Sequence, residues 1–148
     1  MADYKTVVVG TDGSESSLHA VARAGAIAGD KSNLLIACAY FPNDDRATEA
    51  AADALGDDAY QVMGSSPTEE ILRTAKERAK AAGATVVDTR SVKGAPVEAL
   101  LQLVSDADAD LLVVGNKGLN SLAGRLLGSV PSDVARKASC DVLIVHTT

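Results

Sequence analysis

The stretch LLVVGNKGLNSLAGRLLGS, from Leu111 to Ser129, contains the features that decide the fold. It opens with four aliphatic residues in a row, which is typical of a strand buried on both faces of a parallel sheet. A glycine-bearing loop follows, and Gly128-Ser129 offers N-cap chemistry for a helix that we expect over 129–137. A buried strand that passes through such a loop into a helix is typical of an α/β protein.

The same alternation of strand and helix patterns runs along the rest of the chain. Short aliphatic or β-branched runs predict strands at 5–10, 33–40, 85–92, 111–115 and 141–145. Apolar residues at helical spacing predict helices after the first strand as far as Gly29, over 67–83, from Pro96 onward, and over 129–137. This order predicts an α/β fold with an open, doubly wound, five-stranded parallel sheet and helices on both faces. Right-handed connections with the first strand in the middle give the strand order 3-2-1-4-5.

The length of 148 residues predicts a single domain, 1–148. Within it, the acidic, alanine-rich stretch 43–66 is expected to be a long surface excursion with some helical character around 47–55. No apolar run approaches the roughly 18 residues of a membrane-spanning helix. The first residues also lack the hydrophobic region of a signal peptide. We therefore expect a cytoplasmic protein with no membrane partner.

The charge distribution favours a small anionic ligand. A net charge of −6 argues against a nucleic-acid partner, because such proteins present a basic surface. Over 115–137, however, basic side chains outnumber acidic ones, and a local positive patch on an acidic protein suits a small anion. Cys38, Cys140, His19 and His146 do not stand at metal-ligand spacing, so they predict no metal site.

Two glycine-bearing turns are expected to meet in this sheet. Ligands of doubly wound sheets bind at the carboxyl ends of the strands, where the winding reverses, which here falls between the first and fourth strands. The first strand ends in GTDGS at 10–14, and the fourth ends in GNKG at 115–118. Glycines at positive φ would gather backbone N–H groups into an anion nest, the helix at Ser129 would add more, and Lys117 and Arg125 would supply charge. Alternatively, the glycines only turn the chain and Ser129 is an ordinary N-cap.

The two turns also carry a family resemblance. GNKG at 115–118 and GS at 128–129 together match G-x2-G-x9-G-[ST], which resembles the nucleotide-binding signature of the universal stress protein family at every fixed position. The stretches at 7–14, 94–96 and 141–145 support the resemblance, which covers essentially the whole chain. The Walker sequence G-x4-G-K-[ST] and the dinucleotide fingerprint G-x-G-x-x-G are absent.

The resemblance implies an adenine-nucleotide site for ATP, AMP or cyclic AMP, with Mg²⁺ as a companion of ATP. The residues placed near the adenosine portion would be Thr11, Asp12, Ala39 and Val114. The residues placed near the ribose and phosphates would be Gly115, Gly118, Gly128, Ser129 and Val130. The segment GRLLGSVP and the ending DVLIVHTT look like those of small single-domain members that take cyclic AMP, so the choice of nucleotide stays open.

The resemblance further implies a homodimer through Asp141–Val145, a strand that would otherwise expose an apolar edge. Three functions remain open: a nucleotide-binding regulator of stress or energy state, a slow ATPase or other ATP-dependent enzyme, and a dimeric scaffold with an empty pocket. Asp12 is the only acid in either turn, and neither histidine is expected nearby, so no catalytic residue is predicted. Phosphoryl transfer by positioning with Mg²⁺ keeps weak hydrolysis open.

Overall fold

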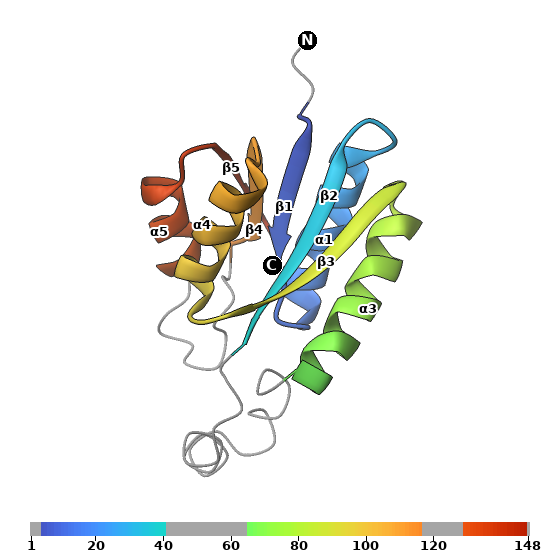
Figure 1. Cartoon of the computed structure of the whole chain (residues 1–148). Helices are drawn as coiled ribbons and strands as arrows, with labels where there is room; N and C mark the ends of the chain where they lie inside the picture. The colour runs from blue at the N-terminus through green and yellow to red at the C-terminus, as the bar shows by residue number, and fades with distance from the viewer. Residues whose placement is uncertain (1–3, 41–64, 117–128, 148) are drawn as a thin grey trace.

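A five-stranded parallel sheet lies between two layers of helices in the computed structural model, which describes residues 4–40, 65–116 and 129–147 (Figure 1). The strand order β3-β2-β1-β4-β5 confirms the predicted order. Every pair of neighbouring strands runs parallel. The strands are β1 (Thr6–Gly10), β2 (Asn33–Tyr40), β3 (Val86–Lys93), β4 (Leu111–Gly115) and β5 (Asp141–Val145).

The helices follow the strands as the apolar periodicity predicts. They are α1 (Glu15–Ala28), α3 (Ser65–Ala81), α4 (Pro96–Ala107) and α5 (Ser129–Lys137). The Ser14 side chain caps α1 by accepting a hydrogen bond from the N–H of Ser17, and Gly29 at φ 52° ends the helix. The predicted α5 bounds are confirmed, whereas α3 begins and ends two residues earlier than the predicted 67–83. The expectation for 43–66 falls almost entirely on 41–64, outside the described residues.

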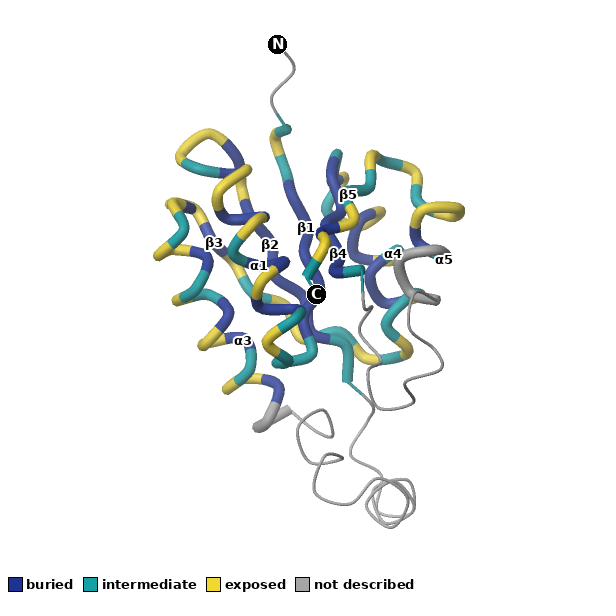
Figure 2. Tube along the Cα trace, turned by 180° about the vertical axis from the view of Figure 1, so that it is seen from behind, coloured by how far each residue is buried: buried dark blue, intermediate teal, exposed yellow. Residues whose placement is uncertain are grey.

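The core consists of two apolar clusters, one on each face of the sheet. In β1, Val7 and Val9 pack toward α1 and α3, while Val8 packs toward α4. Figure 2 shows that the central strands are buried along most of their length. This burial explains why β1 and β4 read as continuous aliphatic runs, whereas β3, at the edge of the sheet, is largely exposed and alternates only over its first half. Among the described residues, no helix is long and apolar enough to cross a membrane.

The α1 and α3 helices approach each other closely at Gly25. A Cβ atom at this position would lie 2.6 Å from the carbonyl oxygen of Ala79. Any larger residue would push α3 away from α1, so glycine is needed here for the two helices to pack this closely.

Candidate functional site

The winding of the sheet reverses between β1 and β4. These strands pair in parallel with Val9 beside Val113, so their carboxyl ends lie next to each other. The chain then leaves β1 into α1 on one face, while α5, the next described helix after β4, lies on the other face (Figure 1). The ends of β1 and β4 therefore diverge at the position where doubly wound sheets bind ligands. We call this place the switch crevice.

The turn after β1 is held by a set of short-range hydrogen bonds. Ser17 Oγ donates to the carbonyl oxygen of Ser14 at 3.0 Å, so the 2.8 Å contact between Thr11 Oγ1 and Ser17 Oγ uses the proton of Thr11. The N–H groups of Asp12 and Gly13 donate to Ser17 Oγ and Thr11 Oγ1. Both hydroxyl groups are buried and fully engaged, which makes this turn rigid.

Asp12 lies on the outer side of the same turn. Its Oδ1 accepts a hydrogen bond from the N–H of Ser14 at 3.0 Å, which closes a local side-chain turn. The next residue, Gly13, has φ 86°, and a Cβ atom there would lie 3.1 Å from Ile71 Cγ1. Backbone conformation and space therefore both require glycine after Asp12.

The exit from β4 is held by residues that are distant in sequence. The N–H of Asn116 donates to the carbonyl oxygen of Val145 at 2.8 Å, which extends the pairing of β4 with β5. Asn116 Oδ1 accepts from both the N–H and the Oγ1 of Thr147, each at 2.8 Å. Thr147 Oγ1 also lies 2.5 Å from Ser16 Oγ on α1. We call Ser16, Asn116 and Thr147 the polar clasp.

The glycine at the start of the signature does not act through positive φ. Positive φ occurs at Gly13 but not at Gly115, so that part of the nest prediction is wrong for Gly115. A Cβ atom on Gly115 would lie 3.4 Å from Thr147 Cγ2 and 3.6 Å from Ser16 Oγ. These are ordinary contact distances, so Gly115 lies directly beside the place where Thr147 and Ser16 meet, and only a side chain larger than that of alanine would displace them.

The predicted site residues differ in where they lie. Thr11, Asp12 and Gly115 lie at the carboxyl ends of the two neighbouring strands, and partly buried Ala39 lies near the end of β2. Val114 is fully buried in the cluster beneath α4, so its side chain is not open to a ligand. Ser129 and Val130 begin α5. Lys117, Gly118, Arg125 and Gly128 lie outside the described residues.

Sequence reasoning missed the polar clasp and misplaced one histidine. Ser16 and Thr147 are 131 residues apart, and no local pattern joins them. His146 was expected to lie away from the crevice, but its Nδ1 lies 3.4 Å from Asn116 Nδ2. The amide nitrogen can only donate, so this contact requires the tautomer of His146 whose Nδ1 accepts. His19 is exposed on α1.

Cys38 lies deep in the sheet near Asp12 and has no reactive character. Burial raises the pKa of the Cys38 thiol to about 12, and the nearby negative charge of Asp12 adds to the effect. The thiol therefore stays protonated at neutral pH and is a poor nucleophile. In the parts of the chain that the structure describes, no three His, Cys, Asp or Glu side chains gather into a metal site.

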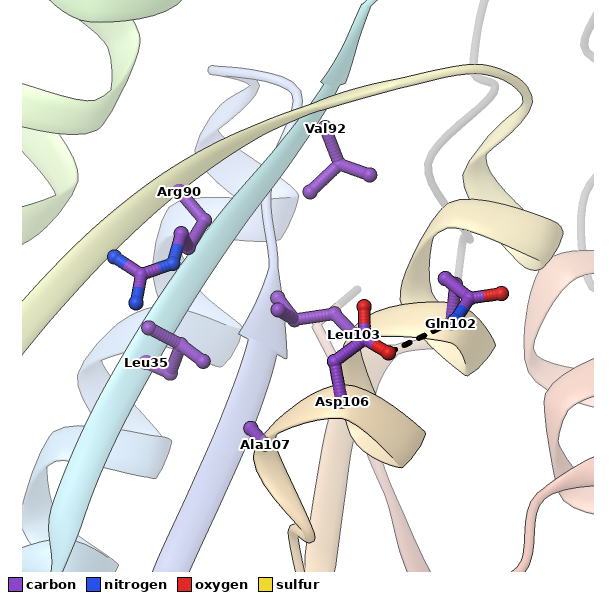
Figure 3. A pocket seen from close by; sticks show the side chains of 7 residues that line it. All are labelled: Leu35, Arg90, Val92, Gln102, Leu103, Asp106 and Ala107. Carbon is purple, nitrogen blue, oxygen red and sulfur yellow. Dashed lines mark hydrogen bonds between the residues drawn. The ribbon is translucent and has the colours of Figure 1, made fainter.

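A hollow of about 280 Å³ lies away from the switch crevice, between α4 and strands β2 and β3 (Figure 3). Apolar side chains line it together with Arg90 and a hydrogen-bonded pair in which Gln102 Nε2 donates to Asp106 Oδ1 at 2.9 Å. None of the predicted site residues lines this hollow.

Nearly the whole chain matches one known family. The model of the universal stress protein family matches residues 3–146. The chain belongs to the universal stress protein family. Universal stress protein Rv1636 from Mycobacterium tuberculosis is 59% identical to this universal stress protein over 148 residues, covering all of both chains.

Solved structures of universal stress proteins share the fold. A crystal structure of a universal stress protein in complex with cAMP is 57% identical, with a TM-score of 0.79, and the match covers 99% of this chain and 100% of that one. The universal stress protein from Archaeoglobus fulgidus in complex with dAMP has a TM-score of 0.67, with 97% and 98% of the chains covered. At 20% identity, this second likeness is one of fold alone.

Proposed function

We propose that this universal stress protein binds an adenine nucleotide in the switch crevice and acts as a regulator of stress or energy state. The observation that carries the proposal is that Gly115, the first glycine of the signature, lies at the switch point beside the rigid turn of Thr11 and Asp12. The crystal structure of a 57% identical universal stress protein in complex with cAMP supports it.

The two sides of the crevice suit different parts of a nucleotide. Asp12 offers a carboxylate oxygen to a donor such as a ribose hydroxyl or the adenine amino group, and Thr11, Ala39 and Val114 complete the proposed adenosine side. Gly115, Gly118, Gly128, Ser129 and Val130 complete the proposed ribose and phosphate side, where backbone N–H groups and the start of α5 favour negative charge. Lys117 and Arg125 would add positive charge.

Regulation is favoured over efficient catalysis by the chemistry of the described residues. Asp12 is the acid of the β1 turn, and one of its oxygens is already engaged by Ser14. The thiol of Cys38 stays protonated. When Mg²⁺ accompanies ATP, the phosphates supply many of its ligands, so one partly engaged carboxylate does not by itself indicate a catalytic metal site. We therefore assign no catalytic step to these side chains.

Native mass spectrometry of freshly purified protein tests the proposal, because a retained nucleotide is identified by its mass. Calorimetric titration with cyclic AMP, AMP and ATP, with and without Mg²⁺, then ranks the ligands. We expect binding of at least one of them, and no turnover of ATP beyond a trace. Failure of all three to bind would refute the proposal, whereas multiple turnovers of ATP would favour the enzyme alternative.

The preferred phosphate state can be tested through the basic residues of the signature. Lys117→Ala combined with Arg125→Ala should weaken ATP binding by about tenfold or more, because three phosphates must be neutralised. Cyclic AMP carries one negative charge and should lose much less. Titrations at two salt concentrations provide the check, since added salt should also weaken ATP binding more. Equal losses for both ligands would contradict a role for these cations in phosphate recognition.

We also propose that two copies associate through β5. This strand ends the sheet on one side, and Ile144 exposes 44% of its surface there. Ile144→Lys should produce a monomer, because a charged side chain would be buried in the pair. Val86→Lys on β3 is a matched control, since Val86 is 52% exposed on the opposite edge. Light scattering of both variants gives the result, and an Ile144→Lys variant with the wild-type mass would refute the pairing.

A further inference from the structure

We infer that the polar clasp positions the β4 exit, and with it Gly115, for nucleotide binding, so that Thr147 and Ser16 are positioning residues of the site. This inference rests on the proposed function. It concerns residues outside the signature, since Ser16 lies on α1 and Thr147 follows β5. Only Asn116 lies within the signature, at one of its variable positions.

The hydrogen bonds of the clasp run in one direction. Thr147 Oγ1 donates to Asn116 Oδ1, so its 2.5 Å contact with Ser16 Oγ uses the proton of Ser16. The chain of donors therefore runs from Ser16 through Thr147 to Asn116, and each bond polarises the next. The N–H of Thr147 adds a second bond to the same amide oxygen. Asn116 is thereby fixed at its side chain as well as at its backbone.

The clasp joins the two sides of the crevice. Ser16 belongs to the first turn of α1, directly after the turn that carries Asp12, whereas Asn116 follows Gly115 at the end of β4. Thr147 bridges them, and its methyl carbon Cγ2 lies where a Cβ atom on Gly115 would touch it at 3.4 Å. A shift of Thr147 would therefore change the spacing between the two turns without altering either turn internally.

Positioning predicts a selective loss. If the clasp sets the β4 exit, its removal should weaken ligands that carry a phosphate, while adenosine, which depends on the β1 side, should bind nearly as before. Thr147→Val keeps the shape of the side chain and removes the hydroxyl group, whereas Thr147→Ser keeps the hydroxyl group. Ser16→Ala removes the first donor and leaves Thr147 in place. Thr85→Val, at an exposed threonine in the turn before β3, is the matched control.

The experiment is calorimetric titration of adenosine, AMP and cyclic AMP into each variant, with thermal unfolding as a check of the fold. We expect Thr147→Val and Ser16→Ala to bind the two phosphate-bearing ligands about five- to tenfold more weakly. Adenosine should change less than about twofold, Thr147→Ser should restore binding, and Thr85→Val should match the wild type.

The outcomes separate this inference from the proposed function. Wild-type protein that binds none of the three ligands would overturn the clasp, and it would overturn the proposed function as well if ATP also fails to bind. Wild-type binding together with an unchanged Thr147→Val and Ser16→Ala would overturn the clasp alone. Equal losses for adenosine and AMP would also overturn it, since that result indicates general damage to the crevice. If Thr147→Val fails to fold, Ser16→Ala decides between the same outcomes.

Discussion

The two ends of the sheet are closed by different chemistry. At the amino-terminal ends of the strands, carboxylates accept several of the hydrogen bonds that side chains make. Asp110 receives the N–H groups of Lys5 and Thr6 at 2.9 Å each, and Asp141 receives the hydroxyl group of Tyr4 at 2.9 Å. These acids hold β1, β4 and β5 together at the end that faces away from the switch crevice.

At the carboxyl ends, the described bonds are mostly between neutral groups. Thr11 is hydrogen-bonded to Ser17, and Asn116 is hydrogen-bonded to Thr147. Neutral hydroxyl and amide groups therefore make the contacts here that carboxylates make at the other end. Asp12 is the exception. The carboxyl ends of the strands, where we propose that an anionic ligand binds, are therefore stabilised with little added negative charge. This arrangement suits phosphate, because each nearby carboxylate would repel it.

The largest effect is expected at the neutral end. Ser17→Ala should lower the free energy of unfolding by about 2–3 kcal/mol, because it removes the partner of the buried Thr11 hydroxyl and of the Asp12 N–H. Urea denaturation measures the loss, and Ser105→Ala on the exposed side of α4 is the control. A loss equal to that of the control would mean that the hydroxyl network adds nothing.

The next largest effect is expected for Gly115→Val, which should lower the free energy of unfolding by about 2 kcal/mol. Its branched side chain must displace Thr147 or Ser16. Gly115→Ala should leave stability nearly unchanged, since its Cβ meets its neighbours at ordinary contact distances of 3.4 Å and more. Thermal unfolding of both variants tests this. Equal destabilisation by alanine and valine would contradict the space that the structure shows.

Asp110→Asn should lower the free energy of unfolding by about 1 kcal/mol at neutral pH. The effect is small because the side chain is partly exposed. Burial opposes ionisation of Asp110, but the N–H groups of Lys5 and Thr6 outweigh it, so the pKa of this carboxyl lies below its ordinary value. The stabilisation is therefore complete above the ordinary pKa of about 4 and disappears as the pH falls through the lower folded-state value.

Urea titrations of Asp110→Asn and wild type from pH 7 to pH 3 measure this convergence. The difference in the free energy of unfolding between wild type and Ser17→Ala should stay constant over the same pH range, because hydroxyl groups do not titrate there. A pH-dependent gap at Ser17, or a constant gap at Asp110, would break the distinction between the two ends.

The smallest effect is expected at Tyr4. Its hydrogen bond to Asp141 is exposed, so Tyr4→Phe should leave stability within experimental error. The same bond raises the pKa of the Tyr4 hydroxyl group, with smaller contributions from burial and from the charges of Asp141 and Asp110. Asp141→Asn should therefore lower the pKa of Tyr4 toward its ordinary value, as NMR titration of labelled tyrosine would show.

The sequence predicts best what is local. The strand order follows from the general handedness of connections in parallel sheets. The bounds of β4, β5 and α5 follow from periodicity and from short motifs, which are local. The turn at Asp12 and Gly13 is also local, since its bonds join residues at most six positions apart. These features need no knowledge of which distant segments meet.

The prediction fails where distant residues meet. Asn116 and Thr147 are 31 residues apart, and polar residues of this kind are common enough that spacing alone cannot pair them. The same reason explains the misplaced His146, which reaches the crevice only because β5 lies beside β4. The glycines show a further limit, because Gly25, which is required for space, has the same letter in the sequence as Gly13, which is required for positive φ.

The central position of β1 has a consequence for the order of folding. It pairs with β2 on one side and with β4 on the other. Val7 therefore cannot pair with Leu111 until β4 has been synthesised. At a ribosomal rate of about 5–20 residues per second, that wait is on the order of 5–20 s. Meanwhile one edge of this buried, apolar strand stays unpaired in the growing chain. A nascent chain of this protein is therefore most vulnerable to misassembly, and most in need of a chaperone, before the second half of the sheet has been translated.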